Sequence, residues 1–199
     1  MASAHDKYAE DYDAEIERYD CHIAEVVFGL CYEDIHPGEN LLDVGIGTGL
    51  SSHLFHLAGL RVFGIDGSQE MLSICAGKGI ATMLSHQDIL KLPWPYQDAS
   101  FDHVISCGVF HFIGELESVF AEIQRVHREN GLLAFSMIKS KDDQEALQQR
   151  IVDGIPVFSH SAKSIHDLLD RHQYVKWKEI ICFVRDTPTR VVCARKRGT

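Results

Sequence analysis

Three glycines at alternate positions follow a short apolar run and one acid, in the segment Leu41-Leu42-Asp43-Val44-Gly45-Ile46-Gly47-Thr48-Gly49. An amphipathic helical pattern begins directly after this segment, which indicates a strand, a tight turn and a helix. Glycine permits positive φ angles in such a turn and lets a ligand approach the backbone closely. The unpaired N–H groups at the start of the helix suit a polar or anionic ligand. The segment therefore predicts a small-ligand site at the turn.

The spacing of the glycines distinguishes this turn from two common nucleotide-binding motifs. A dinucleotide fingerprint reads G-x-G-x-x-G, and here the third glycine comes one residue early, with Leu50 in the expected place. A phosphate-binding P-loop needs Gly-Lys-Ser/Thr, which this turn lacks. A nicotinamide oxidoreductase is therefore disfavoured. For the glycines taken alone, a plain strand-to-helix turn stays as the alternative.

Two further acids end the next two predicted strands. Asp66 follows the apolar run 61–65 and is followed by Gly67, and Asp88 follows a third strand-like segment at 82–85. An acid at the tip of the second strand of a βαβ unit can accept hydrogen bonds from two ribose hydroxyls. Ser68 is a predicted N-cap for a helix that carries Met71. Either acid alone could be an ordinary surface acid.

Taken together, D-x-G-x-G-x-G and the two later acids resemble the class I S-adenosylmethionine (SAM)-dependent methyltransferases, with the glycine segment as their motif I. The resemblance implies SAM as the cofactor and S-adenosylhomocysteine as its product. It implies that Asp66 binds ribose, and that Asp88 accepts a hydrogen bond from the adenine amino group while Ile89 packs on the ring. The full set of residues expected to bind the cofactor is Tyr8, Tyr12, Asp43, Gly45, Gly47, Gly49, Asp66, Gly67, Met71, Asp88, Ile89 and Cys107.

The two tyrosines in this set come from the N-terminal segment. Tyr8-Ala9-Glu10-Asp11-Tyr12-Asp13 is similar to the Y-A-x-x-Y-D segment that folds over the cofactor in many small-molecule methyltransferases. The resemblance implies a lid that excludes water from the reacting centre. The alternative is a helix over 5–19 whose tyrosines only cover an apolar face.

The end of the predicted fourth strand, Ser106-Cys107-Gly108-Val109-Phe110-His111, should face the methyl group, because ligands in open α/β sheets sit at the carboxyl ends of the strands. His111 is the candidate general base, since a histidine pKa suits neutral pH; a structural histidine is the alternative. Cys107 lacks the His/Asp pattern of an activated nucleophile, so a small buried residue is the better interpretation. His160 and Tyr174 are further candidates for the acceptor side by position alone. No histidine spacing indicates a metal site, and no metal is expected.

The methyl acceptor is expected to be a small molecule. DNA and RNA amino-methyltransferases that resemble this fold carry N/D-P-P-Y/F/W after the fourth strand, where this chain has Ser106-Cys107-Gly108-Val109. The formal net charge is −10, which disfavours nucleic acid as a partner and favours a neutral, cationic or small acceptor. A catalytically silent methyltransferase-like domain that acts as a binding or partner subunit is the alternative. The acceptor, the atom methylated and the oligomeric state are left open.

Strands and helices alternate along the chain, which predicts an α/β sheet covered on both faces. The resemblance implies a Rossmann-like, doubly wound, mostly parallel seven-stranded sheet whose last strand is antiparallel. Residues 1–39 would form a helical cap, 40–138 the cofactor-binding core, and 139–199 C-terminal helices and a β-hairpin, all in one domain. In the last part we expect helices at 141–150 and 164–169 and hairpin strands at 176–184 and 190–194.

Composition places the chain among ordinary globular proteins. It has 199 residues, 45% hydrophobic and 24% charged, enough for one sizeable core. No apolar run reaches about 18 residues, and the polar N-terminus differs from a secretory signal, so we expect a cytoplasmic protein without a membrane span. The six cysteines form no C-x-x-C pair, and we expect free thiols.

Overall fold

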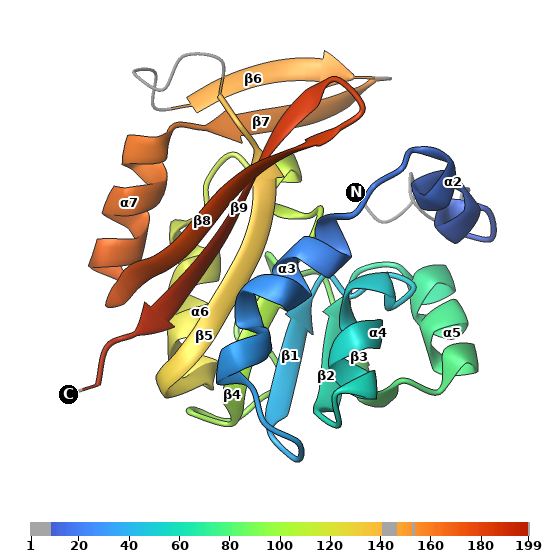
Figure 1. Ribbon diagram of the computed structural model, residues 1–199, viewed down its shortest axis with the longest axis vertical. Helices are drawn as coiled ribbons and strands as arrows, with labels where there is room; N and C mark the ends of the chain where they lie inside the picture. The colour runs from blue at the N-terminus through green and yellow to red at the C-terminus, as the bar shows by residue number, and fades with distance from the viewer. Residues whose placement is uncertain (1–8, 141–146, 153, 199) are drawn as a thin grey trace.

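A computed structural model describes residues 9–140, 147–152 and 154–198 (Figure 1). Its centre is a seven-stranded sheet of order β3-β2-β1-β4-β5-β9-β8. Strands β1 to β5 are parallel, and β9 runs antiparallel to both of its neighbours. The strands are β1 (Asn40–Val44), β2 (Arg61–Asp66), β3 (Ala81–His86), β4 (Phe101–Ser106), β5 (His127–Ile138), β8 (Tyr174–Val184) and β9 (Thr187–Lys196). The predicted α/β, Rossmann-like seven-stranded sheet is confirmed.

Helices cover both faces of this sheet, and each face has its own apolar core. Side chains of α3, α4 and α5 pack with one face, and side chains of α6 and α7 pack with the other. Two-sided burial explains why consecutive residues of the central strands, such as Leu41-Leu42 and Val104-Ile105, are both apolar and buried. The helices are α2 (Tyr12–Arg18), α3 (Ile23–Cys31), η2 (Tyr32–Asp34), α4 (Leu50–Leu57), α5 (Gln69–Lys78), η3 (Phe110–Phe112), α6 (Glu117–Val126) and α7 (Ala162–Arg171).

The C-terminal hairpin is confirmed, with longer strands and a tighter turn than expected. Val184 pairs with Thr187, so only Arg185 and Asp186 lie between β8 and β9. Arg185 has a φ of 51°, a left-handed conformation that suits two-residue hairpin turns. The turn brings the Arg185 guanidinium onto the ring of Tyr19, the C-cap of α2.

The expected helix at 141–150 is wrong in its described part. Residues 147–152 form β6 (Leu147–Val152), which pairs with β7 (Ile155–His160) in a separate two-stranded antiparallel sheet. The polar run Gln148-Gln149-Arg150 favours a helix by propensity, but pairing with β7 overrides this preference. Residues 141–146 lie outside the described residues. The helix expected at 164–169 is confirmed as part of α7.

None of the helices in the described part of the chain has the length and apolar character needed to cross a bilayer. The six cysteines are free thiols, as expected from the sequence. Trp94, in the loop after β3, is buried in the core.

Candidate active site

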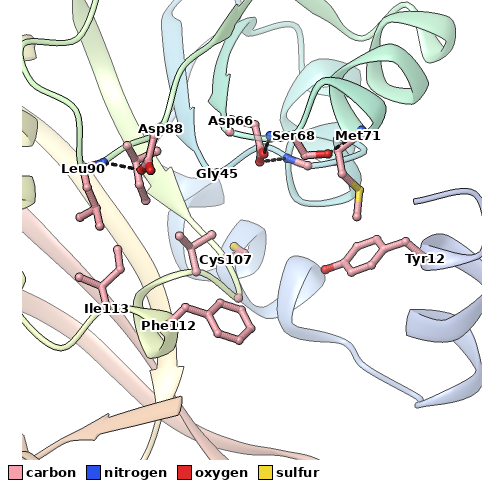
Figure 2. Close-up of a pocket in the computed structure, with 15 residues that line it drawn as sticks. Tyr12, Gly45, Asp66, Ser68, Met71, Asp88, Leu90, Cys107, Phe112 and Ile113 are labelled. Carbon is pink, nitrogen blue, oxygen red and sulfur yellow. Dashed lines mark hydrogen bonds between the residues drawn. The ribbon is translucent and has the colours of Figure 1, made fainter. Parts of the chain in front are cut away.

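A cavity of about 160 Å³ lies at the carboxyl ends of β1, β2 and β4, where open α/β sheets bind ligands. Figure 2 shows residues from several elements turned toward this space. We call it the first cavity. The predicted residues on its wall are Tyr12, Gly45, Gly47, Asp66, Gly67, Met71, Asp88, Ile89 and Cys107. Segments far apart in the chain thus meet at one place, as expected for residues at the carboxyl ends of neighbouring parallel strands.

The glycine turn owes its shape to close packing on one side and open space on the other. A Cβ on Gly45 would lie 2.4 Å from Val109 Cγ2, and one on Gly49 would lie 2.4 Å from Ile80 Cδ1. Both residues also have positive φ, so any side chain there would be strained. A Cβ added to Gly47 would have no atom of the described residues within 4 Å. Gly45 and Gly47 line the cavity, whereas Gly49 supports the turn from behind.

Asp66 joins the glycine turn to the start of α5. Its Oδ2 accepts a hydrogen bond from Gly47 N at 2.8 Å, and its Oδ1 accepts one from Ser68 N at 2.8 Å. The Ser68 hydroxyl in turn accepts from Met71 N at 3.2 Å, which confirms Ser68 as the N-cap. Each carboxylate oxygen can accept more than one hydrogen bond. The Asp66 carboxylate therefore fixes the loop and can still accept from the hydroxyls of a ligand.

Asp88 and Ile89 form a further part of the wall of the first cavity. Asp88 Oδ1 accepts a hydrogen bond from Leu90 N at 2.9 Å, which orients the carboxylate at the cavity edge (Figure 2). The Ile89 side chain packs against the core below, and its carbonyl accepts from Trp94 Nε1 at 3.0 Å. A polar acceptor beside a fixed apolar side chain suits a flat heterocycle that carries an amino group.

Asp43 lies beneath the turn and does not reach the cavity wall. Its Oδ2 accepts a hydrogen bond from Ser52 Oγ at 2.7 Å, while its Oδ1 is buried and has no hydrogen-bond partner among the described residues. Burial raises the pKa of this carboxyl to about 7; the Ser52 hydrogen bond opposes the shift and the charge of Asp66 adds to it. An unpaired buried carboxyl oxygen next to a ligand site favours a proton or a cationic group nearby.

A larger cavity of about 550 Å³ adjoins the first, and we call it the second cavity. Its wall is built from α2 and α3, from β6 and β7, and from the tip of the β8–β9 hairpin. The two cavities share four residues, Tyr12, Cys107, Gly108 and Phe112. His111 lines the second cavity only, and its ring centroid lies 4.1 Å from that of Phe112. The candidate base therefore lies on the second-cavity side of the shared wall.

The two ionisable groups on the shared wall are held in their neutral forms. Burial is the main cause that raises the pKa of Tyr12 to about 12, with smaller contributions from Cys21 and Cys107. Burial and the nearby Asp43 raise the pKa of the Cys107 thiol well above its usual value. The Cys107 thiol thus has no nucleophilic character near neutral pH. In Figure 2 the Tyr12 hydroxyl points into the space between Met71 and Phe112.

Helix α2 is held over the cavities from two sides. Asp13 Oδ1 accepts a hydrogen bond from Thr48 Oγ1 at 2.6 Å, and Asp13 Oδ2 pairs with Lys78 Nζ at 2.5 Å. At the other end of the helix, the Arg185 guanidinium lies 3.6 Å from the Tyr19 ring centroid. The described part of the predicted lid therefore contacts both the glycine turn and the hairpin. Tyr8 lies outside the described residues.

Sequence reasoning assigned His160 and Tyr174 to the acceptor side by position only, and neither lines the second cavity. His160 Nε2 lies 3.1 Å from the Ile113 carbonyl oxygen. Tyr174 is fully buried, and its hydroxyl lies 2.9 Å from His127 Nδ1. Three charged residues were not predicted from the sequence: Asp13, which contacts Thr48 and Lys78, and Arg150 and Arg185, which line the second cavity. The local sequence signal of a charged side chain is the same at such places as in solvent.

Comparison with known proteins agrees with this geometry. A family described as "Methyltransferase domain" matches residues 42–135. The chain is 35% identical over 159 residues to malonyl-[acyl-carrier protein] O-methyltransferase of Serratia marcescens, covering 77% of this chain and 59% of that protein. It is 27% identical to phosphoethanolamine N-methyltransferase 2 of Caenorhabditis elegans, covering 72% of this chain and 34% of that protein. The chain thus spans about 59% and 34% of these relatives' lengths.

A solved structure has the same fold over nearly its full length. The crystal structure of an S-adenosylmethionine-dependent methyltransferase from Clostridium acetobutylicum superposes with a TM-score of 0.74, at 18% sequence identity. The match covers 98% of this chain and 100% of that one. At 18% sequence identity, this similarity shows that the two proteins share a fold and nothing further.

Proposed function

The chain belongs to the class I S-adenosylmethionine-dependent methyltransferase family, and we propose that it transfers the methyl group of this cofactor to a small-molecule acceptor. The observation that carries the proposal is the pair of adjoining cavities that share Tyr12, Cys107, Gly108 and Phe112. A bimolecular transfer needs two sites whose ligands meet at one point, and the shared wall supplies such a point.

The residues of the first cavity fit the cofactor. The open space at Gly47, the carboxylate of Asp66 and the apolar face of Ile89 suit a backbone-contacting tail, a ribose and an adenine ring. The unpaired Oδ1 of Asp43, close behind the turn, suits the positive charge that the cofactor carries. We assign Asp66 to the ribose hydroxyls, Asp88 to the adenine amino group, and Met71 and Ile89 to the faces of the ring.

SAM would supply a methyl group bonded to a positively charged sulfur. In-line attack of the acceptor on the methyl carbon would break the carbon–sulfur bond and release the sulfur as a neutral thioether. The donor is already activated, so the protein mainly aligns the acceptor and excludes water. Helix α2 contributes by covering the shared wall with Tyr12, whose neutral phenol can donate a hydrogen bond. His111 is the group on the acceptor side that can take the proton of a hydroxyl or ammonium acceptor onto a ring nitrogen.

The family does not determine the acceptor. The two relatives are named for different acceptors and for different methylated atoms, oxygen in one and nitrogen in the other. A small molecule is supported by the second cavity of about 550 Å³, a volume typical of small-molecule sites. The lining of this cavity therefore determines which acceptors can bind.

Two measurements test the proposal. Calorimetry should show binding of SAM and S-adenosylhomocysteine and no binding of NAD, since the turn lacks the dinucleotide spacing. Incubation with methyl-labelled SAM and a small-metabolite extract should give a labelled product, with nucleic acid as the comparison substrate. Folded protein that binds neither adenosyl ligand would contradict the proposal. Binding of both without turnover on any fraction would favour the silent partner subunit.

A further inference from the structure

The wall of the second cavity carries positive charge. Among the described residues, the lining side chains that always carry a positive charge are Arg150 on β6 and Arg185 at the hairpin tip, and no Asp or Glu lines the cavity. The described part of the chain also places no carboxylate within ion-pair distance of either arginine. The lining therefore has the opposite sign to the overall net charge of −10. A ligand responds to the nearest charges in a cavity, since more distant surface charges are screened.

The stacking of Arg185 makes it suitable for binding an anion. Its guanidinium lies 3.6 Å from the Tyr19 ring centroid, a distance typical of a cation–π contact. Such a contact orients the planar group and leaves its in-plane N–H donors available for a planar oxyanion. The charge of Arg185 is thus held in place by an aromatic ring, which does not neutralise it.

The arginines lie away from the point of transfer. Neither Arg150 nor Arg185 belongs to the wall shared by the two cavities. Tyr19, which holds Arg185, is the C-cap of the helix that begins at Tyr12. Seven residues at the helical rise of 1.5 Å separate the Cα atoms of Tyr12 and Tyr19 by about 10 Å. An acidic group on Arg185 would therefore lie roughly 10 Å from the shared wall.

Much of the remaining wall of the second cavity is apolar. A chain or ring system would contact aliphatic side chains from four elements, namely Ile16, Ile138, Val157 and Val184. An amphipathic acid matches this arrangement, with its anionic group at the arginines, its apolar body along these residues and its nucleophile at the shared wall.

We propose that the acceptor is a small amphipathic acid whose carboxylate or phosphate binds Arg150 and Arg185, and that a different group, about 10 Å away, receives the methyl. The proposal rests on the methyl transfer proposed above and names its substrate class. The acidic group serves for binding and does not receive the methyl, because arginine stabilises its negative charge and thereby makes its oxygens poorer nucleophiles. The net charge of −10 alone favours a neutral or cationic acceptor, whereas the arginines that line the second cavity favour an anionic one.

The test uses three ten-carbon probes that share one apolar chain: decanoate, decyl phosphate and decanamide. Each is titrated by calorimetry into the full chain, both alone and saturated with S-adenosylhomocysteine. We expect the acids to bind at least about tenfold more tightly than the amide, since charge-assisted hydrogen bonds to a guanidinium are stronger than hydrogen bonds to a neutral amide. Tighter binding of decanoate would assign a carboxylate, and tighter binding of decyl phosphate would assign a phosphate. Either result supports an acidic group bound by the arginines.

Variants assign the effect to the arginines. Arg150→Gln and Arg185→Gln should each weaken binding of the preferred acid roughly 10- to 100-fold, with decanamide unchanged. Arg61→Gln is the matched control; Arg61 starts β2, at the opposite end of the strands from the cavities, and its loss should change nothing. Arg185→Lys should restore part of the affinity, because it keeps the charge without the planar fork.

Three results would overturn the proposal: equal affinity for decanamide and the acids, no binding of any probe, or equal losses in Arg61→Gln and the two arginine variants. Failure of the proposed function is read separately. It would appear as no binding of S-adenosylhomocysteine, whereas titrations of the ligand-free chain would still measure whether the acids bind more tightly than decanamide.

Discussion

Removal of the Asp13 side chain is expected to weaken cofactor binding, although Asp13 does not line the first cavity. Asp13 connects α2 to the glycine turn through Thr48 and to the end of α5 through Lys78. Helix α2 carries Tyr12 onto the shared wall. If α2 closes over the bound cofactor, then breaking these contacts lowers the fraction of molecules in the closed form, and the apparent affinity falls with that fraction.

The two contacts of Asp13 differ in strength because they differ in exposure. Thr48 is 1% exposed, so its hydrogen bond to the carboxylate is worth about 1.5–3 kcal/mol. The side chains of Lys78 and Asp13 are 29% and 37% exposed, which limits their ion pair to about 0.5 kcal/mol. Asp13→Ala should thus destabilise the closed form by about 2–3.5 kcal/mol, or at most roughly 30- to 300-fold in affinity.

The assay is calorimetric titration of S-adenosylhomocysteine into the parent chain and its variants, with melting temperatures measured in parallel. Thr48→Val should reproduce most of the loss of Asp13→Ala, and Lys78→Met only a small part. The double variant of Asp13 and Thr48 should lose no more than Asp13→Ala alone, since the two residues share one contact. Glu17→Ala is the control, because Glu17 lies on the same helix, carries the same charge and is exposed.

Two outcomes would refute this reasoning. Unchanged affinity in Asp13→Ala, with a normal melting temperature, would mean that α2 does not cover the bound cofactor. Additive losses in the double variant would mean that Asp13 and Thr48 act on the site separately.

Three further predictions concern single residues. Asp66→Asn should weaken S-adenosylhomocysteine binding more than Asp88→Asn in calorimetry, because the Asp66 carboxylate also holds two backbone amides; equal losses would contradict the assignment. His111→Gln should lower turnover about 10²- to 10⁴-fold with unchanged product affinity, whereas a lower melting temperature with full turnover would make His111 structural. The folded-state pKa of Asp43 is raised from 3.8 to about 7, so its contribution to stability is lost as pH rises through that window. Denaturant unfolding should therefore show Asp43→Asn gaining stability relative to the parent between about pH 4 and pH 7; a difference independent of pH would refute the shift.

Local patterns in the sequence predicted an α/β sheet with a ligand site at its strand ends, whereas the seven strands and the antiparallel last strand came from the family resemblance. The turn at Gly45 and Gly47 and the acids Asp66 and Asp88 each follow an apolar strand-like segment. Parallel strands end at the same edge of a sheet, so residues at successive strand tips must meet there. That rule holds whatever the side chains between the strands, and the structure brings these residues to one cavity.

Only the tertiary structure decided how the acceptor side is built. Strand β6 exists because residues 147–152 pair with β7, although their polar sequence favours a helix. Asp13 meets Thr48, and Arg185 meets Tyr19, across long stretches of chain. A charged side chain has no periodic signal that separates a cavity from solvent, and its partner depends on how distant segments fold together. The residues of the first cavity could therefore be predicted from short-range sequence patterns, whereas the charge of the second cavity depends on long-range contacts.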